Sequence, residues 1–563
     1  MIDLNPKHFE IVQHILAKYV PKCEVRAFGS RVKWTAKDYS DLDLAVVGSK
    51  PLTLRQTGQL AEAFEESNLP IRVDILDWHR ISEEFKKIIT EEYEVIQGPE
   101  TVTANEESGT IPKNSTPKNN RWDVVKLGDV VQINPRRTLP KKEKAFHLAM
   151  RDVEVYRQKI TSHSSKEFRG SGARFQNGDT LLARITPCLE NGKTVYVDCL
   201  KPNQIGHGST EFIVLSGIED KTDNLFIYYL ARDPSLRTFA IHSMQGSTGR
   251  QRVDANSLRL FELPLPPIEE QRRIAHILGT LDGKIELNRQ MNETLEATAR
   301  AIFKSWFVDF DPVKTKMEGR KPACMDTETA ALFPSAFQDS PLGKIPQGWE
   351  VEKIGNLVEI VKGRSYRSRE LRESDVALVT LKSIRRGGGY LPDNLRPYTG
   401  KYNPEQVITP GELVIAYTDL TQEAEILGKP AIVRGDEKYQ TLVPSLHLRI
   451  IRSLESTVSV RFLYYLFRER RFQSHVYGYA TGTTVLGLSK DGVPSYQFAL
   501  PPEKIRCLFD SVAEPLFAKI ESNENESRTL AQTRDRLLPK LLSGEIRVDD
   551  AAEMLEVTDS EKS

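Results

Sequence analysis

Cysteine is scarce in this chain, and its spacing excludes two kinds of structural site. The 563 residues contain five cysteines, none of which forms a Cys-x-x-Cys pair with another: positions 23, 188, 199, 324 and 507. Neither a structural zinc site nor a disulfide framework fits so sparse a set. The scarcity is typical of a protein in a reducing cytosol, so we expect a cytoplasmic location.

Long apolar runs and several catalytic signatures are also missing. The chain shows no run of 18 apolar residues and no signal peptide, so we expect no membrane span. It has no Gly-x-x-x-x-Gly-Lys-[Ser/Thr] phosphate loop and no Asn/Asp-Pro-Pro-Tyr/Phe motif, which excludes an ATPase motor of that kind and gives no sign of an adenine methyltransferase. The histidines show no metal-ligand spacing.

Neither sign of charge is in excess overall, but the charge is unevenly distributed. Residues 1–100 carry 13 Lys+Arg against 17 Asp+Glu, residues 121–265 carry 22 against 16, and residues 349–500 carry 21 against 17. A polyanionic partner is therefore expected to meet the two later blocks. The length predicts three or four globular domains.

Two carboxylates stand at alternate positions of one predicted strand. The stretch FGSRVKWTAKDYSDLDLAVV (28–47) contains Asp41 and Asp43, whose side chains point to the same face because a strand alternates. Such neighbours repel unless a cation lies between them, and Mg²⁺ is the usual one. Asp74, within IRVDILDW on another predicted strand, offers a third carboxylate.

The turn ahead of these carboxylates suits a phosphate group. Gly29-Ser30 predicts a tight turn whose backbone N–H groups and hydroxyl bind phosphate, and Arg31 is a candidate for a further phosphate contact or for a surface role. The alternative is a strand that enters solvent, with Asp41 as a helix or turn cap.

Gly29, Ser30, Asp41, Asp43 and Asp74 occur in the order that the nucleotidyltransferases of the DNA polymerase β superfamily show. Residues 1–98 resemble the minimal domains of that family. The resemblance implies that the three aspartates are catalytic and bind Mg²⁺, and that a nucleotide is transferred from an NTP. Whether the domain is active, and on which acceptor, stays open.

The chain repeats itself after a linker. Residues 99–120 are rich in Pro, Ser, Thr and Asn, which predicts a flexible linker. After the linker comes the segment RWDVVKLGDVVQI, and a similar segment, GWEVEKIGNLVEI, occurs later in the chain. Their tryptophans, Trp122 and Trp349, are offset by 349 − 122 = 227. LPLPPIEEQRRI likewise returns as FALPPEKIRCLF, where Pro266 and Pro501 are offset by 235. Two copies of one unit are therefore expected.

Each copy ends in a long helical pattern after the Pro-Pro break. Apolar residues recur at steps of three, four and seven, and Asn288 and Asn523 fill the one gap at equivalent positions. We predict that the two helices pack on each other; the alternative is an ordinary amphipathic helix on its own domain. The apolar seam positions are Ile274, Ile277, Leu281, Ile285, Leu295, Ile302 and Trp306 in the first copy, and Phe509, Val512, Leu516, Ile520, Leu530, Leu537 and Leu541 in the second.

The repeat resembles the specificity subunit of type I restriction–modification systems. The resemblance runs over residues 121–548 and includes LPPIEEQRRIAHILGTLDGKIELNRQ and LLPKLLSGEIRV. It implies two target-recognition domains, each reading half of a split site in double-stranded DNA, and two antiparallel spacer helices. It also implies docking of two methyltransferase subunits and two motor-nuclease subunits, which use S-adenosylmethionine and ATP, while the specificity part of this chain itself needs no cofactor.

Base contacts are expected from polar loops of the two recognition domains. Arg and Gln form paired hydrogen bonds with guanine and adenine edges, and glycine permits close approach to DNA. MQGSTGRQR (244–252) and YGYATGTTVLG (477–487) occupy equivalent places in the two copies. Gly387–Gly389 is expected to be only a flexible loop. The candidate DNA contacts are Arg184, Arg250, Gln251 and Arg252 in the first copy and Tyr417, Thr483 and Thr484 in the second, and the alternative for each is an exposed loop residue.

These patterns predict an α+β multidomain fold. A small α/β nucleotidyltransferase-like domain precedes two mixed α/β target-recognition domains, which two long antiparallel coiled-coil helices separate in a pseudo-twofold repeat. The expected segments are the nucleotidyltransferase domain 1–98, linker 99–120, recognition domain 121–267, spacer helix 268–310, connector 311–345, recognition domain 346–502, spacer helix 503–548 and acidic tail 549–563.

The leading hypothesis is a DNA-specificity scaffold, itself non-catalytic, with an added nucleotidyltransferase domain. In one alternative that domain is an active enzyme, antitoxin-like, which modifies a protein or RNA and which the repeat targets to DNA. In another it is an inert docking module.

Overall fold

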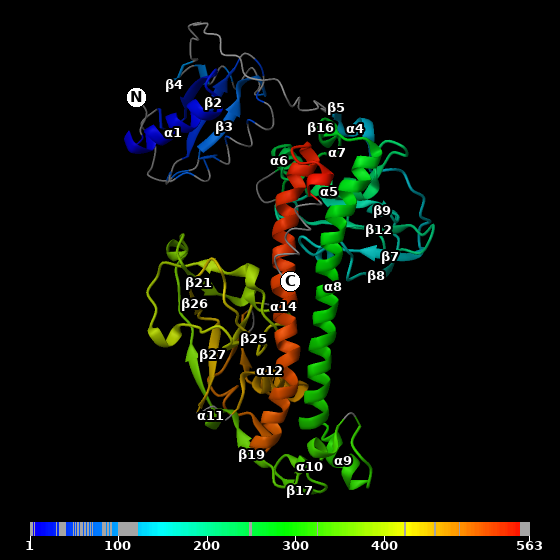
Figure 1. Ribbon diagram of the computed structural model, residues 1–563, viewed down its shortest axis with the longest axis vertical. Helices are drawn as coiled ribbons and strands as arrows, with labels where there is room; N and C mark the ends of the chain where they lie inside the picture. The colour runs from blue at the N-terminus through cyan, green and yellow to red at the C-terminus, as the bar shows by residue number, and fades with distance from the viewer. Residues whose placement is uncertain are drawn as a thin grey trace, which may run out of the picture. The chain divides into compact units, whose positions relative to one another are not determined.

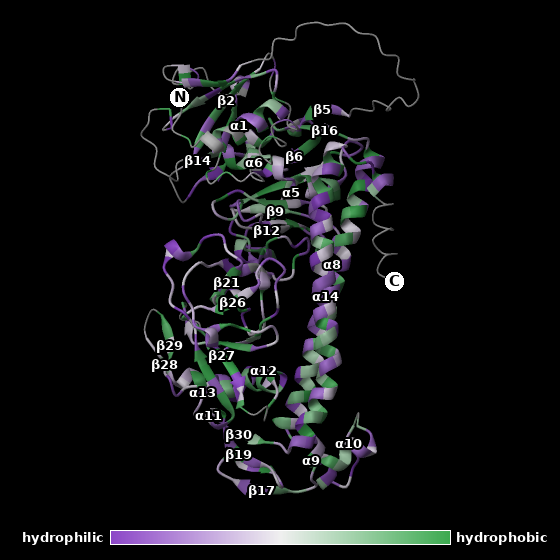
Figure 2. Cartoon of the chain, turned by 60° about the vertical axis from the view of Figure 1, so that its left-hand side comes forward, coloured by the Kyte–Doolittle hydropathy of each residue, from purple (hydrophilic) through white to green (hydrophobic). Residues whose placement is uncertain are grey.

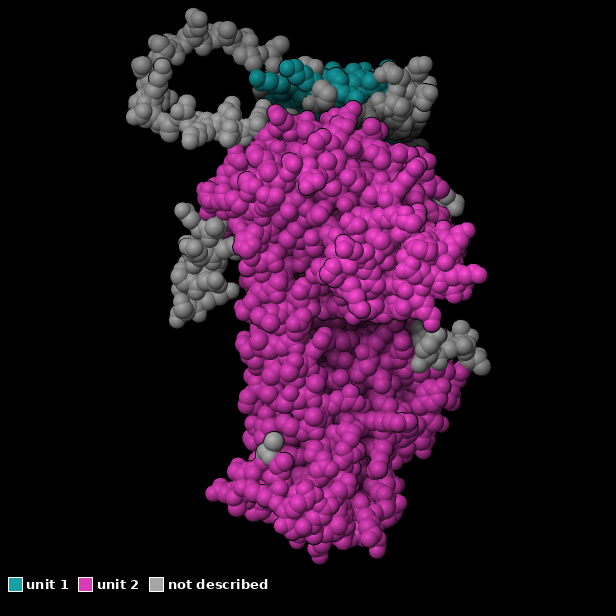
Figure 3. Space-filling view, turned by 90° about the vertical axis from the view of Figure 1, so that its right-hand side faces the viewer, with its two compact units in different colours: residues 1–118 teal, residues 119–563 magenta. Residues whose placement is uncertain are grey.

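The computed structural model divides the chain into two compact units, residues 1–118 and 119–563 (Figure 3). In the first unit it describes residues 4, 6–29, 31–32, 41–48, 50, 52, 56, 60, 63–64, 67, 69, 71, 73–80, 86, 89–90 and 93–98. In the second it describes residues 122–551 except 247–249, 324, 421–423, 455–457 and 483–484. Among these residues no helix is both long enough and apolar enough to cross a membrane.

A four-stranded sheet with strand order β3-β2-β1-β4 forms the centre of the first unit. β2 and β3 are parallel, whereas β1 pairs antiparallel with β2 and β4. Alternation sends Val25, Leu42 and Leu44 into a core with Leu16 of α1, so Asp43 projects from the opposite face. The elements are α1 (Pro6–Tyr19), β1 (Glu24–Phe28), β2 (Leu42–Val47), β3 (Val73–Asp77), the 3₁₀ turn η1 (Trp78–Arg80) and β4 (Tyr93–Gln97).

The second unit contains a closely similar series of elements twice, as the repeat predicts. The first copy consists of β5 (Asp123–Lys126), α4 (Leu127–Val130), β6 (Val131–Ile133), β7 (Lys144–Leu148), η2 (Met150–Asp152), β8 (Ser164–Glu167), β9 (Ala173–Phe175), β10 (Thr180–Ala183), β11 (Thr194–Tyr196), β12 (Gly206–Gly208), β13 (Phe212–Gly217), α5 (Asn224–Arg232), α6 (Pro234–His242), β14 (Met244–Gln245), β15 (Arg252–Val253), α7 (Ala255–Leu258), β16 (Glu262–Leu265) and α8 (Ile268–Phe307).

The second copy follows a similar order, but it adds several 3₁₀ turns and the strand β24 and has one strand fewer between its equivalents of β7 and β10. It consists of β19 (Glu350–Lys353), α11 (Ile354–Leu357), β20 (Val358–Lys362), η3 (Ser368–Glu370), β21 (Val376–Val379), η4 (Leu381–Ser383), η5 (Pro392–Asn394), β22 (Arg396–Pro397), η6 (Pro404–Gln406), β23 (Leu413–Ala416), β24 (Thr418–Asp419), β25 (Pro430–Ile432), β26 (Thr441–Pro444), β27 (Leu448–Ser453), α12 (Val460–Arg468), α13 (Arg470–Gly478), β28 (Ala480–Thr481), β29 (Leu486–Leu488), β30 (Gln497–Leu500) and α14 (Glu503–Ser543).

The β-rich parts of the two copies, domain I (residues 123–265) and domain II (residues 350–500), have matching sheets. The sheet β11-β10-β13-β6 corresponds to β25-β23-β27-β20, and β7 and β12 correspond to the neighbours β21 and β26. β5 pairs with β16, and β19 pairs with β30, so the first and last strands of each domain lie together. Each domain therefore closes on itself before its long helix begins.

The expected pairing of the two long helices is confirmed (Figure 1). From Asp282 to Asn292 along α8, the partners on α14 move back from Arg534 to Asn523, so the helices are antiparallel. Asn288 and Asn523 are each 1% exposed. The Asn288 amide donates to the Asn523 carbonyl oxygen (3.3 Å), and the Asn523 amide donates to Oδ1 of Asn292 (2.8 Å). Because buried amides need partners, these contacts fix the register of the seam.

Both helices carry hydrophilic and hydrophobic residues along their length (Figure 2). The beginning of α8 and the end of α14 form one core with α5 of domain I, which contains Tyr229, Leu278 and Leu541. The end of α8 and the beginning of α14 form another with domain II, which contains Phe303 and Phe509. Each domain therefore packs against both helices, at opposite ends of the pair.

The helices are shorter than expected at their carboxyl ends. α8 ends at Phe307 rather than at residue 310, where Phe310 takes a left-handed conformation (φ 55°) ahead of the next helix. α14 ends at Ser543 rather than at residue 548, because Gly544 caps it with φ 73°. The segment between the copies contains α9 (Asp311–Met317), α10 (Thr327–Leu332), β17 (Phe337–Ser340) and β18 (Gly343–Pro346).

Candidate functional site

The first unit brings its predicted carboxylates to one edge of the sheet. Asp43 of β2 is in direct register with Asp74 of the parallel strand β3, so both project from the same face. Asp41 immediately precedes β2 and is exposed. Burial raises the pKa of the Asp43 carboxyl, and the charges of Asp74 and Asp41 raise it further. The three groups are therefore electrostatically coupled.

Gly29 brings the preceding turn against this pair of carboxylates. Its φ is +82°, and a Cβ atom built there would lie 2.4 Å from Oδ2 of Asp43. Any side chain at this position would displace the carboxylate, so only glycine permits the approach. Arg31 is 6% exposed, which does not suit the surface role considered above. Ser30 lies outside the described residues.

The donor chemistry of the site suits Mg²⁺, which prefers carboxylate oxygens. The raised pKa of Asp43 reflects a negative charge that its neighbours disfavour and that a cation would stabilise. In the part of the chain that the structure describes, no three His, Cys, Asp or Glu side chains are arranged to enclose a metal ion. The site consists of two facing carboxylates with a third at its edge.

In domain I the candidate DNA contacts gather at the small sheet β14–β15, here called edge sheet I. Ile185 bridges to Arg252, and the Val253 amide donates to the Arg184 carbonyl oxygen (2.9 Å). The Thr186 amide donates to the carbonyl oxygen of Gln251 (3.1 Å). The fold therefore brings residues 184 and 250–252 together. Arg250 and Arg252 are both exposed, and the Arg252 guanidinium is paired with Glu211 at 2.8 Å.

Domain II has an equivalent sheet, β24-β29-β28, here called edge sheet II. The Leu488 amide donates to the Tyr417 carbonyl oxygen (2.8 Å), just as Val253 donates to Arg184 in domain I. The Tyr417 side chain is 4% exposed and lies beneath the guanidinium of Arg449, 4.1 Å from the ring centroid. A base contact by Tyr417 is therefore not supported, because its ring packs in the core. Thr483 and Thr484 lie outside the described residues.

Sequence reasoning did not single out Arg449. It lies on β27, stacked on Tyr417, and its Nε atom has no hydrogen-bond partner among the described residues. The available signal was one arginine inside the apolar run LHLRII. That signal is weak, because only the fold shows that β27 passes beside edge sheet II.

Comparisons with known proteins agree with both halves of this description. Residues 119–297 match the family described as "Type I restriction modification DNA specificity domain", and residues 10–100 match "Polymerase beta, Nucleotidyltransferase". The chain is 26% identical over 473 residues to the type I restriction enzyme MjaIX specificity subunit of Methanocaldococcus jannaschii, covering 80% of this chain and 98% of that protein.

Two proteins of Haemophilus influenzae are also similar. The HindI specificity subunit is 26% identical over 416 residues, which cover 66% of this chain and 87% of that protein. The protein named "Probable protein adenylyltransferase MntA" is 50% identical over 99 residues, which cover 18% of this chain and 87% of that protein. The chain belongs to the type I restriction–modification specificity subunits and carries an N-terminal nucleotidyltransferase domain.

The specificity subunit ties each domain to a long helix with an arginine. In domain I, Arg157 donates to both carboxylate oxygens of Glu286 on α8, at 2.8 and 3.0 Å. In domain II, Arg434 pairs with Glu524 on α14. Charge-assisted pairs of this kind fix orientation as well as position. The two edge sheets are therefore carried on domains that are anchored to one common helical pair.

Proposed function

We propose that this chain reads a bipartite DNA site, one half with the recognition domain at residues 121–267 and the other with that at 346–502. The observation that carries the proposal is the structural repeat itself. Edge sheets I and II occupy equivalent places but present different side chains, so each suits a different half-site. The antiparallel helices hold the two domains at one separation, which would set the length of DNA between the half-sites.

The proposed base contacts in domain I come from Arg184, Arg250 and Gln251. Arg252 takes part through its pairing with Glu211, which would orient its guanidinium. In domain II we assign the contacts to Thr483 and Thr484 and add Arg449, for which Tyr417 serves as a positioning residue. Arginine is suited to guanine O6 and N7, and glutamine to adenine N6 and N7.

The partners in this proposal are those of the type I complexes. Two methyltransferase subunits, which use S-adenosylmethionine, would dock on the spacer helices, and two motor-nuclease subunits, which use ATP, would join them. The similarity to the MjaIX and HindI specificity subunits over most of their length supports this assignment.

A domain exchange tests the split reading. Residues 122–265 are replaced by the equivalent domain of another specificity subunit, and the methylated motif of the host is determined by methylome sequencing. The proposal expects one half of the motif to change while the other half and the spacing remain. A change in both halves, or in neither, would contradict it. The host that lacks the gene serves as the control and should lose the motif.

We further propose that the N-terminal domain transfers a nucleotide from an NTP, with Asp41, Asp43 and Asp74 as metal ligands. The identity of 50% with the protein named MntA supports this, as does the approach of Gly29 to Asp43. Bound Mg²⁺ would neutralise charge on the NTP phosphates. Gly29, Ser30 and Arg31 would hold those phosphates, and one carboxylate would accept the proton of the attacking hydroxyl group.

Transfer of label from an NTP by the purified full chain tests this second role. We expect the Asp41→Ala, Asp43→Ala double variant to lose transfer and Mg²⁺-dependent nucleotide binding while DNA binding stays unchanged. A wild-type chain that neither binds nor transfers any nucleotide over a panel of acceptors would favour the docking module. Loss of specific DNA binding in the double variant would contradict the independence of the two parts.

A further inference from the structure

A large cavity lies between domain I, the two long helices and domain II. Its volume is about 2170 Å³, and its walls include residues 154–157 of domain I, residues 384–392 and 434–439 of domain II, and the middle of α8 and α14. Pockets for small molecules usually measure about 300–1,000 Å³. The size therefore favours part of a macromolecule as the occupant.

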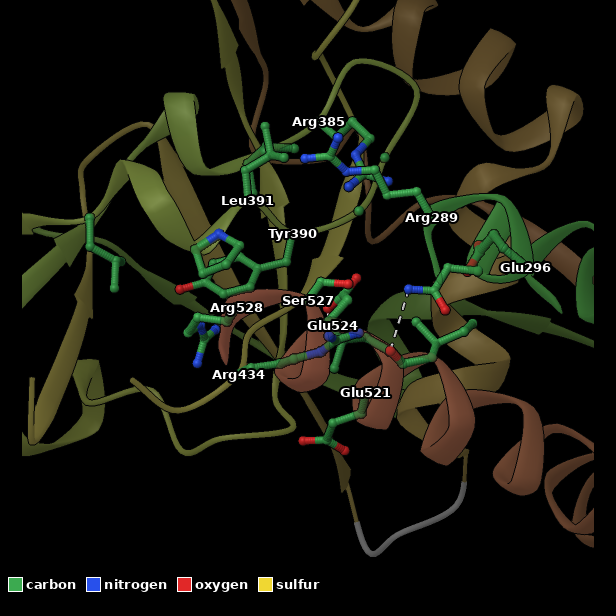
Figure 4. Close-up of a pocket in the computed structure, with 18 of the residues that line it drawn as sticks. Arg289, Glu296, Arg385, Tyr390, Leu391, Arg434, Glu521, Glu524, Ser527 and Arg528 are labelled. Atoms are coloured by element: carbon green, nitrogen blue, oxygen red, sulfur yellow. Dashed lines mark hydrogen bonds and ion pairs between the residues drawn. The ribbon is translucent and has the colours of Figure 1, made fainter. Parts of the chain in front are cut away.

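Four arginines of this cavity form a group that we call the arginine cradle: Arg289, Arg385, Arg434 and Arg528 (Figure 4). Arg289 belongs to α8 and Arg528 to α14, while Arg385 follows η4 and Arg434 follows β25. The cradle therefore combines both helices with two loops of domain II.

The positive charge of the cradle is only partly compensated. Arg434 pairs with Glu524, whereas Arg385 and Arg528 form no ion pair with any residue that the structure describes. Arg289 lies 3.9 Å from Glu286, whose carboxylate is already bound by Arg157. Burial lowers the pKa of Arg289, and the charge of Arg157 lowers it further. Burial, together with the charges of Arg385 and Arg528, also lowers the pKa of Arg434, although Glu521 opposes this. Carboxylates, Glu521 among them, also line the cavity, so the charge that an anion would stabilise is that of Arg385 and Arg528.

An anchored hairpin carries Arg385. The Arg385 amide donates to the Gly389 carbonyl oxygen, and the Gly388 amide donates back to Arg385, both at 2.9 Å. Gly387, Gly388 and Gly389 all have positive φ (85°, 101° and 107°), and the Gly389 amide donates to the Pro430 carbonyl oxygen (2.9 Å). The run expected to be only a flexible loop is thus a defined turn that holds Arg385 at the cavity.

The cavity reaches from domain I to edge sheet II. Asp419 of β24 and the adjoining Leu420 line it, and β24 pairs with β29 of that sheet. At the other end it is lined by Tyr156 and Arg157 of domain I. The cradle therefore lies in the interval between the two domains to which the half-sites are assigned.

We propose that the arginine cradle binds phosphates of the DNA backbone in the unread interval between the two half-sites. The inference rests on the proposed split reading. Such contacts contribute affinity and fix the register of the duplex without reading its sequence, because phosphates carry no base information. A cavity that large, with arginines on both of its walls, suits a run of backbone phosphates better than one small anion.

The affinity of the full chain for a DNA duplex that contains the motif methylated in the host tests the cradle. The variant Arg385→Gln, Arg528→Gln is compared with wild type and with Lys314→Gln, Arg320→Gln, which removes the same charge from the exposed α9 region. We expect the cradle variant to reduce the slope of log K against log salt by about 2, while the control changes it little. The preferred sequence should stay the same.

A second test replaces backbone phosphates in the interval between the half-sites with neutral methylphosphonates. Wild type should lose about tenfold in affinity for such a duplex and little when the substitutions lie outside both half-sites, while the cradle variant should be insensitive to both. A wild type that is insensitive to the interval, or a cradle variant with the wild-type salt slope and melting temperature, would overturn the cradle alone. A wild type that prefers no split-site duplex would overturn the proposed function, and the cradle with it.

Discussion

Each domain packs on the two long helices at one junction. The backbone elements at the two junctions are equivalent, but the first junction, beside domain I, contains a buried ion network, whereas the second, beside domain II, contains an aromatic contact in its place. Beside domain I, Asp282 of α8 is buried and accepts hydrogen bonds from Tyr229 (2.9 Å), Arg232 (3.3 Å) and Arg534 of α14. Beside domain II the equivalents of Asp282 and Arg534 are Phe517 (282 + 235) and Ala299 (534 − 235).

At the junction beside domain II, the equivalent arginine, Arg468, has a different acidic partner. Tyr465 packs on Phe517 with ring centroids 5.8 Å apart, and Arg468 pairs with Glu296 rather than with residue 517. The Tyr464 hydroxyl also donates to Glu296 (3.1 Å). One helical pair thus accepts either a buried ion network or an aromatic contact, provided that every buried charge has a partner.

The asymmetry also favours pairing of one copy with the other. A helix pair made from two second copies would place Arg534 opposite Phe517, and one made from two first copies would place Asp282 opposite Ala299. Both leave a buried charge without its partner on the facing helix, which is costly.

The largest effect is expected at the seam beside domain I. Leu281→Asp should lower the free energy of unfolding by more than about 4 kcal/mol, because it removes a buried leucine and buries a carboxylate. Leu516→Asp, at the equivalent half-buried position, should cost about half as much. Urea unfolding of the full chain measures both. An unchanged stability and unchanged co-purification of the methyltransferase in Leu281→Asp would contradict the paired helices.

Breaking the ion network should cost nearly as much. Asp282→Ala should lower the free energy of unfolding by about 3 kcal/mol, because it removes the buried acid that Arg232 and Arg534 share and leaves both arginines with the exposed Asp535 as their acidic partner. The triple variant Asp282→Phe, Ala531→Glu, Arg534→Ala gives the junction beside domain I the residues found at the equivalent positions beside domain II. It should recover most of that lost stability. If the triple variant is no more stable than Asp282→Ala, the junctions are not interchangeable.

At the centre of the seam the two copies should respond alike. Asn288→Ala removes the amide that donates to the Asn523 carbonyl oxygen, and Asn523→Ala removes the amide that donates to Oδ1 of Asn292. Each variant should lower the free energy of unfolding by about 1–2 kcal/mol. The same urea series provides the measurement. A difference between them larger than about 1 kcal/mol would show that the seam is not symmetric at its centre.

The smallest effect is a difference in pH dependence. Burial raises the pKa of Glu286, but its bonds with Arg157 outweigh this and hold it below its usual value. Glu286 therefore stabilises the fold above the unfolded-state pKa, and this stability is lost as the pH falls through the folded-state pKa. Glu286→Gln should destabilise at neutral pH by about 1 kcal/mol or less and not in acid.

Glu469 in domain II should behave in the opposite sense. Burial raises the pKa of its carboxyl, so its contribution is favourable at low pH and is lost as the pH rises. Glu469→Gln should therefore increase the stability at neutral pH. Thermal unfolding between acid and neutral pH compares the two variants, and curves of the same sign would contradict the difference.

Much of the fold could be predicted because its signals are local. The Pro-Pro breaks, the steps of three, four and seven, and the matched asparagines all lie within short segments, and the structure pairs the helices accordingly. The order of Gly29, Asp41, Asp43 and Asp74 likewise predicted a set of carboxylates on neighbouring strands.

The expectations for Tyr417 and for the glycines at 387–389 failed because they depended on contacts between distant segments. The position of Tyr417 in an apolar strand run did not reveal that Arg449 would lie over its ring, and the three glycines at 387–389 gave no sign of the hydrogen bonds that define their turn. Such contacts join residues far apart in the chain, so no pattern within one segment encodes them.

The sequence by itself determined the internal repeat, the two long helices and the carboxylate-bearing strands, because periodicity and chain-breaking residues act over a few neighbours. Only the tertiary structure decided that Asp43 faces Asp74 in register, that Asp282 finds Arg534 across the seam, and that four arginines from separate segments line one cavity. The physical reason is that register and charge pairing are set by packing between distant segments, where the requirement to partner every buried charge selects one arrangement.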